Sequence, residues 1–580
     1  MTRLNKHPIW PYSMQMILII SILCFPPNSV SQDRLVDTLS DELNREMTAL
    51  QSQETPPYFI SYCVSDVHRT TVRASFGSLI YSNSTDSRLL SVIVRVGDYE
   101  MDNMHEMRDD PFSQFTVRFG GFIRLARDES EEAIRATLWQ ETNREYRQAV
   151  ERFTKVKANI AVKIAEEDTS ADFSREPELA VYNEPPVDIQ ALLGDRSLWE
   201  SKVKAYSKPF LENADIYGGL ASFGFTVERK ILVTTEGTRL TQNLMYARLI
   251  INGFIKSDDG MELPLYKSYS AFKPKDLPEN EEILRDVGVL IKKLEALQNA
   301  PVVDPYTGPA ILSGRAAGVF FHEVFGHRIE GHRQKIEEEG QTFKKKIGEK
   351  ILPENLRVIF DPTKKSFNGQ DLIGHYKYDD EGIQARFVTV VDSGVFKAFL
   401  MSRSPIENFP LSNGHGRAQA GYRPVSRQSN MLITSSQSIS EQKLRQKLIN
   451  ECKKQGKPFG LLFQDIEGGF TFTGRTLPNM FNVLPTEVYR VYTDGRPDEI
   501  IRGVDMVGTP LVMFSMISDI GDQFDIFTGL CGAESGSIPV SAVAPAVLVS
   551  QIEVQKKSKS QERPPILPRP DAELIQIRNR

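Results

Sequence analysis

Three of the eight histidines in this chain lie within eleven residues, in the segment FFHEVFGHRIEGHR. His322, His327 and His332 are accompanied there by Glu323 and Glu330. Imidazoles bind divalent metals, and a carboxylate beside them can act as a general base in hydrolysis. The spacing differs from the H-E-x-x-H motif, in which two histidines four residues apart share one face of a helix. The segment therefore predicts a metal site whose backbone departs from a regular helix.

The residues before the motif predict the helix that carries it. Ser313 is an N-cap candidate, and good helix formers follow it as far as Gly326, which places His322 and Glu323 on the helix. In an ideal α-helix, residues five apart lie about 140° from one another, so His322 and His327 would not share a metal. A π-type bulge, or a bend at Gly326, would bring the two histidines together. In a third arrangement Glu323 and His327 are the ligands. The spacing alone leaves all three open.

The length and charge of the chain exclude some classes of protein. A chain of 580 residues is longer than the roughly 250–300 residues at which single cores stop growing, so we expect two or more domains. Apolar residues at 40% and charged residues at 25% are typical of a folded globular protein. The formal net charge of −6 gives no reason to expect a nucleic-acid partner, because such proteins usually carry a basic domain or stripe.

Residues 1–31 have the three regions of an export signal. Arg3 and Lys6 precede the apolar run MILIISILCF, and the small residues Ser29 and Ser31 follow it. The alternative is a retained membrane anchor, but an apolar run of about ten residues is shorter than the roughly twenty that a spanning helix needs. We therefore expect this segment to be cleaved and the protein to be periplasmic or secreted.

The cysteine count gives a second indication of bound metal. Cys24 leaves with the signal, and Cys63, Cys452 and Cys531 remain in a compartment that permits disulfides. Because three is an odd number, at least one thiol is free, paired with another chain or bound to something. Cys531 lies in the glycine-rich segment FTGLCGAESGSIPV, where backbone can approach closely. Each cysteine could instead be a small buried side chain, which is our interpretation of Cys63 in YFISYCVSDV.

Periodicity predicts an α+β fold in two parts. The first part, residues 32–300, is expected to be an α+β domain. Its predicted elements are a helix from about 33 to 50, strands in 78–100 separated by an N-S-T-D-S turn, a helix from about 129 to 163, strands in 225–256 with an E-G turn, and a helix over 280–300.

A proline-rich break, PVVDPYTGP, marks the boundary near residue 300. Residues 301–555 are rich in strands, glycine and short turns, and we expect them to form the strand-rich domain that holds the metal. Residues 556–580, which include KKSKSQERPPILPRPD, are charged and proline-rich, and are predicted to be a disordered tail.

The motif and five further segments resemble one known family. FHEVFGHRIEGH is similar to the H-E-x-x-x-H motif of the TldD/PmbA metallopeptidases, once called modulators of DNA gyrase. The other segments agree in order: YTGPAILSGRAAGVFFHE (306–323), YDDEGIQARFVTVVDSGVFKAFLMSR (378–403), NGHGRAQAGYRPVSRQSNMLI (413–433), GGFTFTGRTLPNMFNVLPTEVYRVYTDGRPDEIIRGVDMVGTP (468–510) and LCGAESGSIPVS (530–541). The resemblance covers nearly all of the second part, and the first part only by general pattern.

The resemblance implies a metallopeptidase and assigns its residues. His322, His327 and Cys531 would bind one Zn²⁺ per chain, with iron as the alternative metal, and Glu323 would be the general base. Three protein ligands with a fourth position open to water are typical of a catalytic zinc. The family also implies a dimer that encloses the metal, here a homodimer or a heterodimer with a family paralogue, and substrates that are short or unfolded peptides.

The sequence leaves the roles of several other residues open. His332 and Glu330 would support the ligands or face solvent. Arg417, Tyr422 and Arg427 are candidates for lining the substrate groove, although paired surface arginines usually only contact water. Two other functions compete with an exported peptidase: a non-catalytic partner subunit of a TldD-type complex, and a metal-dependent amidohydrolase that acts on cell-wall peptides.

Overall fold

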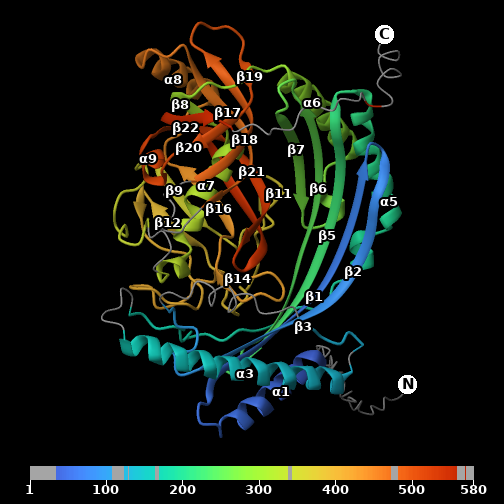
Figure 1. The fold of residues 1–580 in the computed structure, drawn as a ribbon, viewed down its shortest axis with the longest axis vertical. Coiled ribbons are helices and arrows are strands. Elements are labelled where there is room, and N and C mark those ends of the chain that lie inside the picture. Colours follow the sequence, from blue (N-terminus) through green and yellow to red (C-terminus); the bar gives the residue numbers. More distant parts are fainter. Residues whose placement is uncertain are drawn as a thin grey trace, which may run out of the picture.

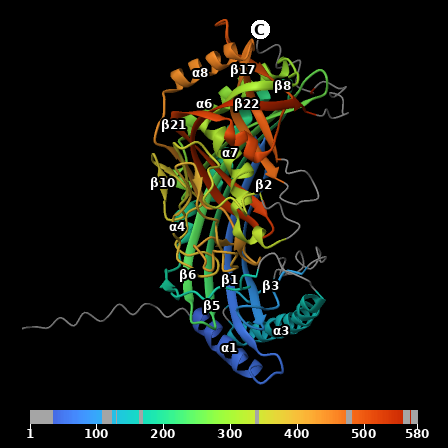
Figure 2. The same cartoon turned by 90° about the vertical axis from the view of Figure 1, so that its left-hand side faces the viewer.

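The chain forms two parts that lie side by side along the long axis of the molecule (Figures 1 and 2). The structure is a computed structural model that describes residues 34–107, 123–128, 130–162, 169–336, 342–471, 481–557 and 569. The predicted export signal lies outside these residues, as does the predicted tail apart from positions 556, 557 and 569. Within them, no helix is long and apolar enough to cross a membrane.

The first part, residues 34–298, is a seven-stranded sheet with helices on one face. Strands follow the order β3-β2-β1-β5-β6-β4, with β7 paired to β6, and all these pairs are antiparallel except β4–β6. The elements are α1 (Arg34–Leu50), β1 (Pro57–Ser75), β2 (Ser78–Val96), β3 (Ile123–Arg124), α3 (Glu131–Val162), β4 (Val181–Asn183), α4 (Ile189–Leu193), α5 (Arg196–Ser207), β5 (Ile216–Thr234), β6 (Arg239–Lys256), β7 (Glu262–Ala271) and α6 (Asn280–Gln298), with 3₁₀ helices η1 (Lys208–Glu212) and η2 (Pro274–Asp276).

Alternation along the strands gives this sheet two different faces. Figure 1 shows β1, β2, β5 and β6 arching along one side of the second part, with α1 and α3 across one end. Apolar side chains such as Tyr62, Phe223 and Leu249 point to the outer face, where α1 and α3 cover one end and α5 and α6 the other. The opposite face carries the intervening residues, which include many hydroxyl and charged side chains. It turns toward the second part and is called the inner face below.

The second part, residues 306–557, is built on an eleven-stranded sheet that partly closes on itself. β22 pairs with β20 and β8, and the chain of pairs β20-β18-β17-β8 returns to β22, so these five strands form a ring. The elements are β8 (Tyr306–Leu312), α7 (Gly314–Val324), η3 (Gly326–Ile329), η4 (Gly331–Gln334), β9 (Leu356–Phe360), β10 (Ser366–Phe367), β11 (Gln370–Asp371), β12 (Val388–Asp392), β13 (Val395–Phe396), β14 (Gly416–Arg417), β15 (Val425–Ser426), β16 (Asn430–Ser435), α8 (Glu441–Lys454), β17 (Phe459–Thr471), β18 (Phe481–Tyr492), β19 (Glu499–Ile501), β20 (Val504–Val507), α9 (Pro510–Ser515), β21 (Ile517–Ala533) and β22 (Gly536–Lys556).

The predicted α+β class is confirmed, and one predicted turn is wrong. The three predicted helices of the first part appear as α1, α3 and α6, and the E-G turn joins β5 to β6. The N-S-T-D-S segment, however, lies inside the continuous strand β2 and pairs with β1 throughout. The turn comes earlier, at Phe76 and Gly77, whose φ angles of 48° and 78° are both positive. Two consecutive residues with positive φ are typical of the two-residue turn of a twisted β-hairpin. The hairpin therefore turns at Phe76 and Gly77, and the N-S-T-D-S segment continues the hydrogen-bonded pairing of β2 with β1.

Ion pairs between side chains join the first part of the chain to the second. Lys230 of β5 is buried and pairs with Asp380 in the loop before β12. Arg403 pairs with Glu236 at 2.6 Å, and Arg423 pairs with Glu145 of α3 at 2.6 Å. Removing one partner of a buried pair generally costs about 3–5 kcal/mol, because the other charge is left without compensation. These pairs therefore hold the sheet in one position against the second part.

Candidate metal centre

Helix α7 carries the first part of the motif and is buried at the centre of the second part (Figure 1). The Ser313 hydroxyl accepts a hydrogen bond from the Ala316 amide at 3.2 Å, so the predicted N-cap is present. Ala316, Ala317 and Gly318 are small enough for the helix to pack closely against β17, β21 and β22. His322 and Glu323 thus project from a rigid, buried helix.

The helix ends at Val324 because other groups take over the bonding of its last turn. The Gln428 side-chain amide donates to the His322 carbonyl at 3.1 Å, in place of the Gly326 amide that would continue the helix. A Cβ on residue 326 would collide with the end of the Gln428 side chain, so a larger residue there would displace this amide from the His322 carbonyl. Arg328 Nη1 donates to the carbonyls of Glu323 and Val324 at 3.3 and 3.0 Å. The free carbonyls of the helix end are satisfied in this way.

This early end returns His327 to the side of His322. Residues 326–329 continue as the 3₁₀ helix η3, and the two imidazole rings lie 5.1 Å apart between centroids. Of the three arrangements left open by the spacing, the structure therefore has the bend at Gly326 and not a π-type bulge. Among the described residues, the group whose donor atoms lie within 4.8 Å of one another is His322, His327 and Cys531. Glu323 is not part of that group.

Cys531 reaches the histidines from the β21–β22 hairpin. It lies near the end of β21, and its Sγ is 3.4 Å from His327 Nε2. Typical zinc–sulfur and zinc–nitrogen bond lengths at a tetrahedral angle put two such donors roughly 3.5 Å apart. Two imidazole nitrogens and a thiolate are also the donor types that zinc prefers. The residues present therefore fit a zinc ion.

The electrostatics of the site favour the thiolate, which is the metal-binding form of cysteine. Burial raises the pKa of Cys531, but the two imidazoles and Arg427 outweigh it, so the pKa lies well below its usual value. Arg427 Nη2 lies 3.3 Å from the sulfur and also donates to the Cys531 carbonyl at 2.7 Å. Burial lowers the pKa of His327, while Cys531 and Glu330 raise it well above its usual value. Binding a cation must therefore release the proton of this ring.

Glu330 orients the second histidine. Its Oε2 lies 3.2 Å from His327 Nδ1, so Nδ1 carries the shared proton and Nε2 faces Cys531. Glu330 is completely buried, and Arg333 Nε donates to it at 2.9 Å. Burial raises the pKa of Glu330, but His327 and Arg333 lower it to about 2, so the carboxyl is ionised. Glu330 is thus a supporting residue, one of the two roles considered for it from the sequence.

The donors open into a pocket between the two parts of the chain. This metal pocket has a volume of about 590 Å³ and is lined by Glu323 next to the donors. Its remaining walls come from β17 and the β21–β22 hairpin and from the inner face of the first part. The lining residues of the first part are Arg248, Ile250, Asn252 and Tyr266. The first part therefore contributes a wall but no donor.

The other candidates from the sequence lie around this pocket in different roles. His332 is buried and bonds to Glu534 in the β21–β22 turn, so it supports the site and is not a member of the donor group. Arg427 contacts Cys531, as described. Arg417 is buried, donates to the Gln428 carbonyl at 2.6 Å and lies outside the metal pocket. Tyr422 lies in a turn that is closed by the carbonyl of Gln419.

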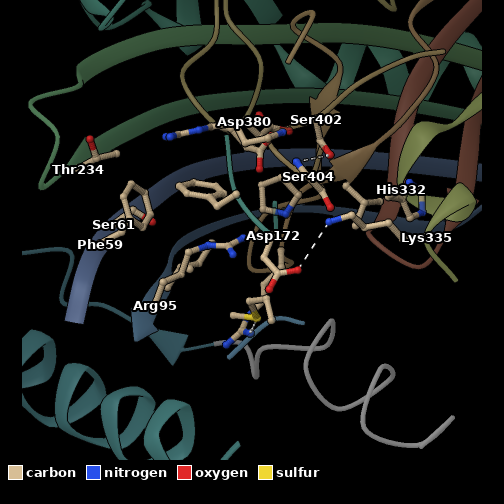
Figure 3. A pocket seen from close by; sticks show the side chains of 18 of the residues that line it. Phe59, Ser61, Arg95, Asp172, Thr234, His332, Lys335, Asp380, Ser402 and Ser404 are labelled. Atoms are coloured by element: carbon tan, nitrogen blue, oxygen red, sulfur yellow. Dashed lines mark hydrogen bonds and ion pairs between the residues drawn. The ribbon is translucent and has the colours of Figure 1, made fainter. Parts of the chain in front are cut away.

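A second cavity, of about 130 Å³, lies between the same two parts (Figure 3). His332 lines it, and Lys335 pairs with Asp172 at 3.6 Å in the same view. The guanidinium groups of Arg95 and Arg403 both lie over the Phe173 ring, at 3.9 and 3.8 Å from its centroid. Arg95 forms an ion pair with Asp102, and Arg403 forms one with Glu236. The charges of Arg95, Lys335 and Arg403 are therefore compensated within the protein.

Comparisons with known proteins point to metallopeptidases. Residues 305–556 match the family described as the PmbA/TldA metallopeptidase C-terminal domain. The chain is 24% identical over 348 residues to a metalloprotease of Methanocaldococcus jannaschii, covering 60% of this chain and 68% of that protein. It is 23% identical over 257 residues to a zinc metalloprotease TldD homolog of Saccharolobus solfataricus, covering 42% and 51%. The matches thus span between about half and two thirds of these relatives' lengths.

The fold of the whole chain is similar to that of a solved structure. The crystal structure of TldE from Thermococcus kodakarensis aligns with a TM-score of 0.58 and 12% identity, over 89% of this chain and 100% of that one. At this identity the likeness shows the shared fold alone, which includes both the curved sheet and the second part.

The donor group predicts different effects for two cysteines. We expect Cys531→Ser to lower the affinity for zinc by more than about 100-fold, since even loss of an outer partner of a ligand costs about 10- to 100-fold. Cys63→Ser should leave the affinity unchanged, because Cys63 lies in β1 and is not part of the donor group. Metal content by mass spectrometry and titration against a chelator measure both. Equal zinc in wild type and Cys531→Ser would place the third ligand elsewhere.

Proposed function

Because the chain belongs to the TldD/PmbA metallopeptidase family, we propose that it hydrolyses peptide bonds with a zinc ion held by His322, His327 and Cys531. The observation that carries the proposal is the convergence of three donors, two nitrogens and one sulfur, at the wall of a pocket that Glu323 also lines. A site with three protein donors and an adjoining open pocket is typical of catalytic zinc, whereas structural zinc usually has four protein ligands.

Different residues of the site have different roles in the proposed peptide hydrolysis. A zinc ion would supply Lewis acidity, polarising a peptide carbonyl and making water a stronger acid. Glu323 accepts a proton from the attacking water and transfers it to the nitrogen of the leaving amine, so water is added across the C–N bond. Glu330 holds His327 in the tautomer that presents Nε2. Arg427 stabilises the Cys531 thiolate through its hydrogen bond to the sulfur.

Burial of the site supports an extended substrate. The side chains of His322, His327 and Cys531 are 4–6% exposed, and the metal pocket lies between the two parts of the chain. A folded domain is too wide to bring its backbone to such donors, whereas an extended peptide can enter and bond to strands through its main chain. We therefore propose that the substrates are short or unfolded peptides and that sequence selectivity is broad.

Glu323→Gln separates chemistry from metal binding. The amide keeps the size of the side chain but cannot accept a proton, so we expect kcat to fall by about 10²- to 10⁴-fold. Zinc content and thermal stability should stay at wild-type values, because Glu323 is not part of the donor group. Peptide turnover and metal analysis on the same preparations test this. Near-normal turnover in Glu323→Gln would disprove its role as the base, and a wild-type chain that binds no metal would favour a non-catalytic partner subunit.

Conformation should decide which proteins are cut. We expect a permanently unfolded variant of a small protein to be degraded at least about tenfold faster than its folded form, with all cleavage stopped by a chelator. The reason is that the folded form offers extended chain only through its small unfolded fraction. Mass spectrometry of the products measures rate and cleavage sites together. Equal rates for the two forms would contradict the buried site, and cleavage of muropeptides alone would point to an amidohydrolase of cell-wall peptides.

We also propose that the protein is exported and acts as a homodimer, since one chain carries every residue of the site. The expected result is a mature N-terminus directly after residue 31 and a solution mass of twice the mature chain. N-terminal sequencing of protein from the native host and light scattering of the purified chain measure the two properties. A retained N-terminus would indicate a membrane anchor instead. A monomer that becomes active only with a paralogue would indicate a heterodimer.

A further inference from the structure

The metal pocket continues into a second groove along the inner face of the sheet. This inner groove, of about 520 Å³, lies between the inner face and the β21–β22 hairpin. Arg248, Ile250 and Leu530 line both the metal pocket and the inner groove. A chain that reaches the donors therefore has a path along the sheet, and Arg248 lies where the two spaces meet.

Arg248 is a cation without a carboxylate partner. Among the described residues, its Nε is buried and has no hydrogen-bond partner, and no carboxylate pairs with its guanidinium. Burial lowers the pKa of Arg248, with two tyrosines and Arg315 as its charged or polar neighbours. A half-buried arginine normally has a partner, because transferring an unpaired charge out of water is costly. The geometry therefore leaves this guanidinium available to a ligand.

The sheet beside Arg248 leaves space for such a ligand. In the strand register, Arg248 of β6 lies opposite Gly224 of the neighbouring strand β5 and opposite Ser270 of the neighbouring strand β7. Paired residues share a face, so Gly224 lies beside Arg248 on the inner face, and no atom lies within 4 Å of where its Cβ would be. On the other side, Ser270 bonds to Thr528 of β21 at 3.0 Å and closes the sheet against the second part. The open floor is therefore on the Gly224 side, along the inner groove.

The charge of the inner groove suits an anion. Arg69 and Arg73 of β1 line it, are exposed, and have no ion pair with the described carboxylates. Its carboxylates are already engaged. Lys230 pairs with both Glu228 and Asp380. The third, Asp379, is buried and accepts hydrogen bonds from the amides of Glu381, Ile383 and Gly416, while burial and then Glu381 raise its pKa above the usual value. Five basic side chains of the groove lining outnumber these three carboxylates: Arg69, Arg73, Lys230, Arg248 and Arg417. The inner groove is therefore cationic although the chain as a whole is acidic, with a net charge of −6.

We propose that Arg248 binds a carboxylate of the peptide substrate, which lies in the inner groove with its scissile end at the metal. The proposal rests on the peptidase function above and adds a chemical preference to it. A guanidinium matches a carboxylate with two parallel hydrogen bonds, and the bond is strong where water is excluded. The carboxylate is either the free C-terminus of the peptide or an aspartate or glutamate side chain, and the experiment separates the two.

The test measures binding without turnover. Three short fluorescent peptides of alanine, serine and glycine are compared on the Glu323→Gln variant: one with a free C-terminus, one amidated, and one amidated with a single internal glutamate. We expect one or both carboxylate peptides to bind about 10- to 100-fold more tightly than the neutral amide, the range for a hydrogen bond to a charged group. Adding Arg248→Gln should abolish that preference while zinc content stays unchanged.

Two further variants make the result decisive. Arg496→Gln removes a positive charge from an exposed turn outside both cavities and should keep the preference. Gly224→Val fills the open floor with a residue that favours strands, and should weaken binding of the carboxylate peptides even if Arg248→Gln fails to fold. Equal affinity for the three peptides, or a preference that survives both Arg248→Gln and Gly224→Val, would overturn the inference. A chain that shows the preference but cuts no peptide contradicts only the proposed function, whereas cleavage without a preference contradicts only this inference.

Discussion

The hydrogen bond from Gln428 to the His322 carbonyl is the interaction on which the metal centre depends. It occupies the acceptor that would otherwise continue α7, and it is possible only because Gly326 has no side chain. With the helix ended there, the chain continues as the 3₁₀ helix η3, and His327 lies beside His322. A regular helix through the same sequence would separate the two imidazoles by about 140°. An ordinary interaction at the end of a helix thus brings together two histidines that are five residues apart, a spacing that would keep them on different sides of a regular helix.

The same region shows what the sequence could and could not predict. Ser313, the following helix and the break at Gly326 carry local signals, and each is found where expected. The choice between a bulge and a bend had no local signal, because it is made by Gln428, which lies 106 residues after His322. The approach of Cys531 likewise depends on the pairing of β21 with β22. Only a resemblance to a family, and not the spacing itself, could connect it to the histidines.

The first part of the chain illustrates a different limit. Its helices and the E-G turn followed from periodicity, but the N-S-T-D-S segment looked like a turn because its residues favour turns. In the structure the partner strand β1 supplies a ladder along its whole length, and the turn is made by Phe76 and Gly77. Arg248 had no signal at all. In an alternating strand, a single arginine usually indicates a solvent-facing position, and only the curvature of the sheet brings it to the metal pocket.

The division of the pocket between the two parts has a consequence for how such proteins change over time. The donors and their supports form one bonded network in which Glu330, Arg427 and Gln428 each contact a ligand or its backbone, so a substitution there disturbs several contacts together. The opposite wall is a sheet face, where single side chains can be exchanged while the backbone ladder stays in register. For the peptidase proposed above, substrate preference can therefore change by point mutation at positions such as 224 and 248 while the donor network stays intact. The fold thus places residues that can be exchanged singly on the sheet face of the first part, and residues that depend on one another in the donor network of the second part.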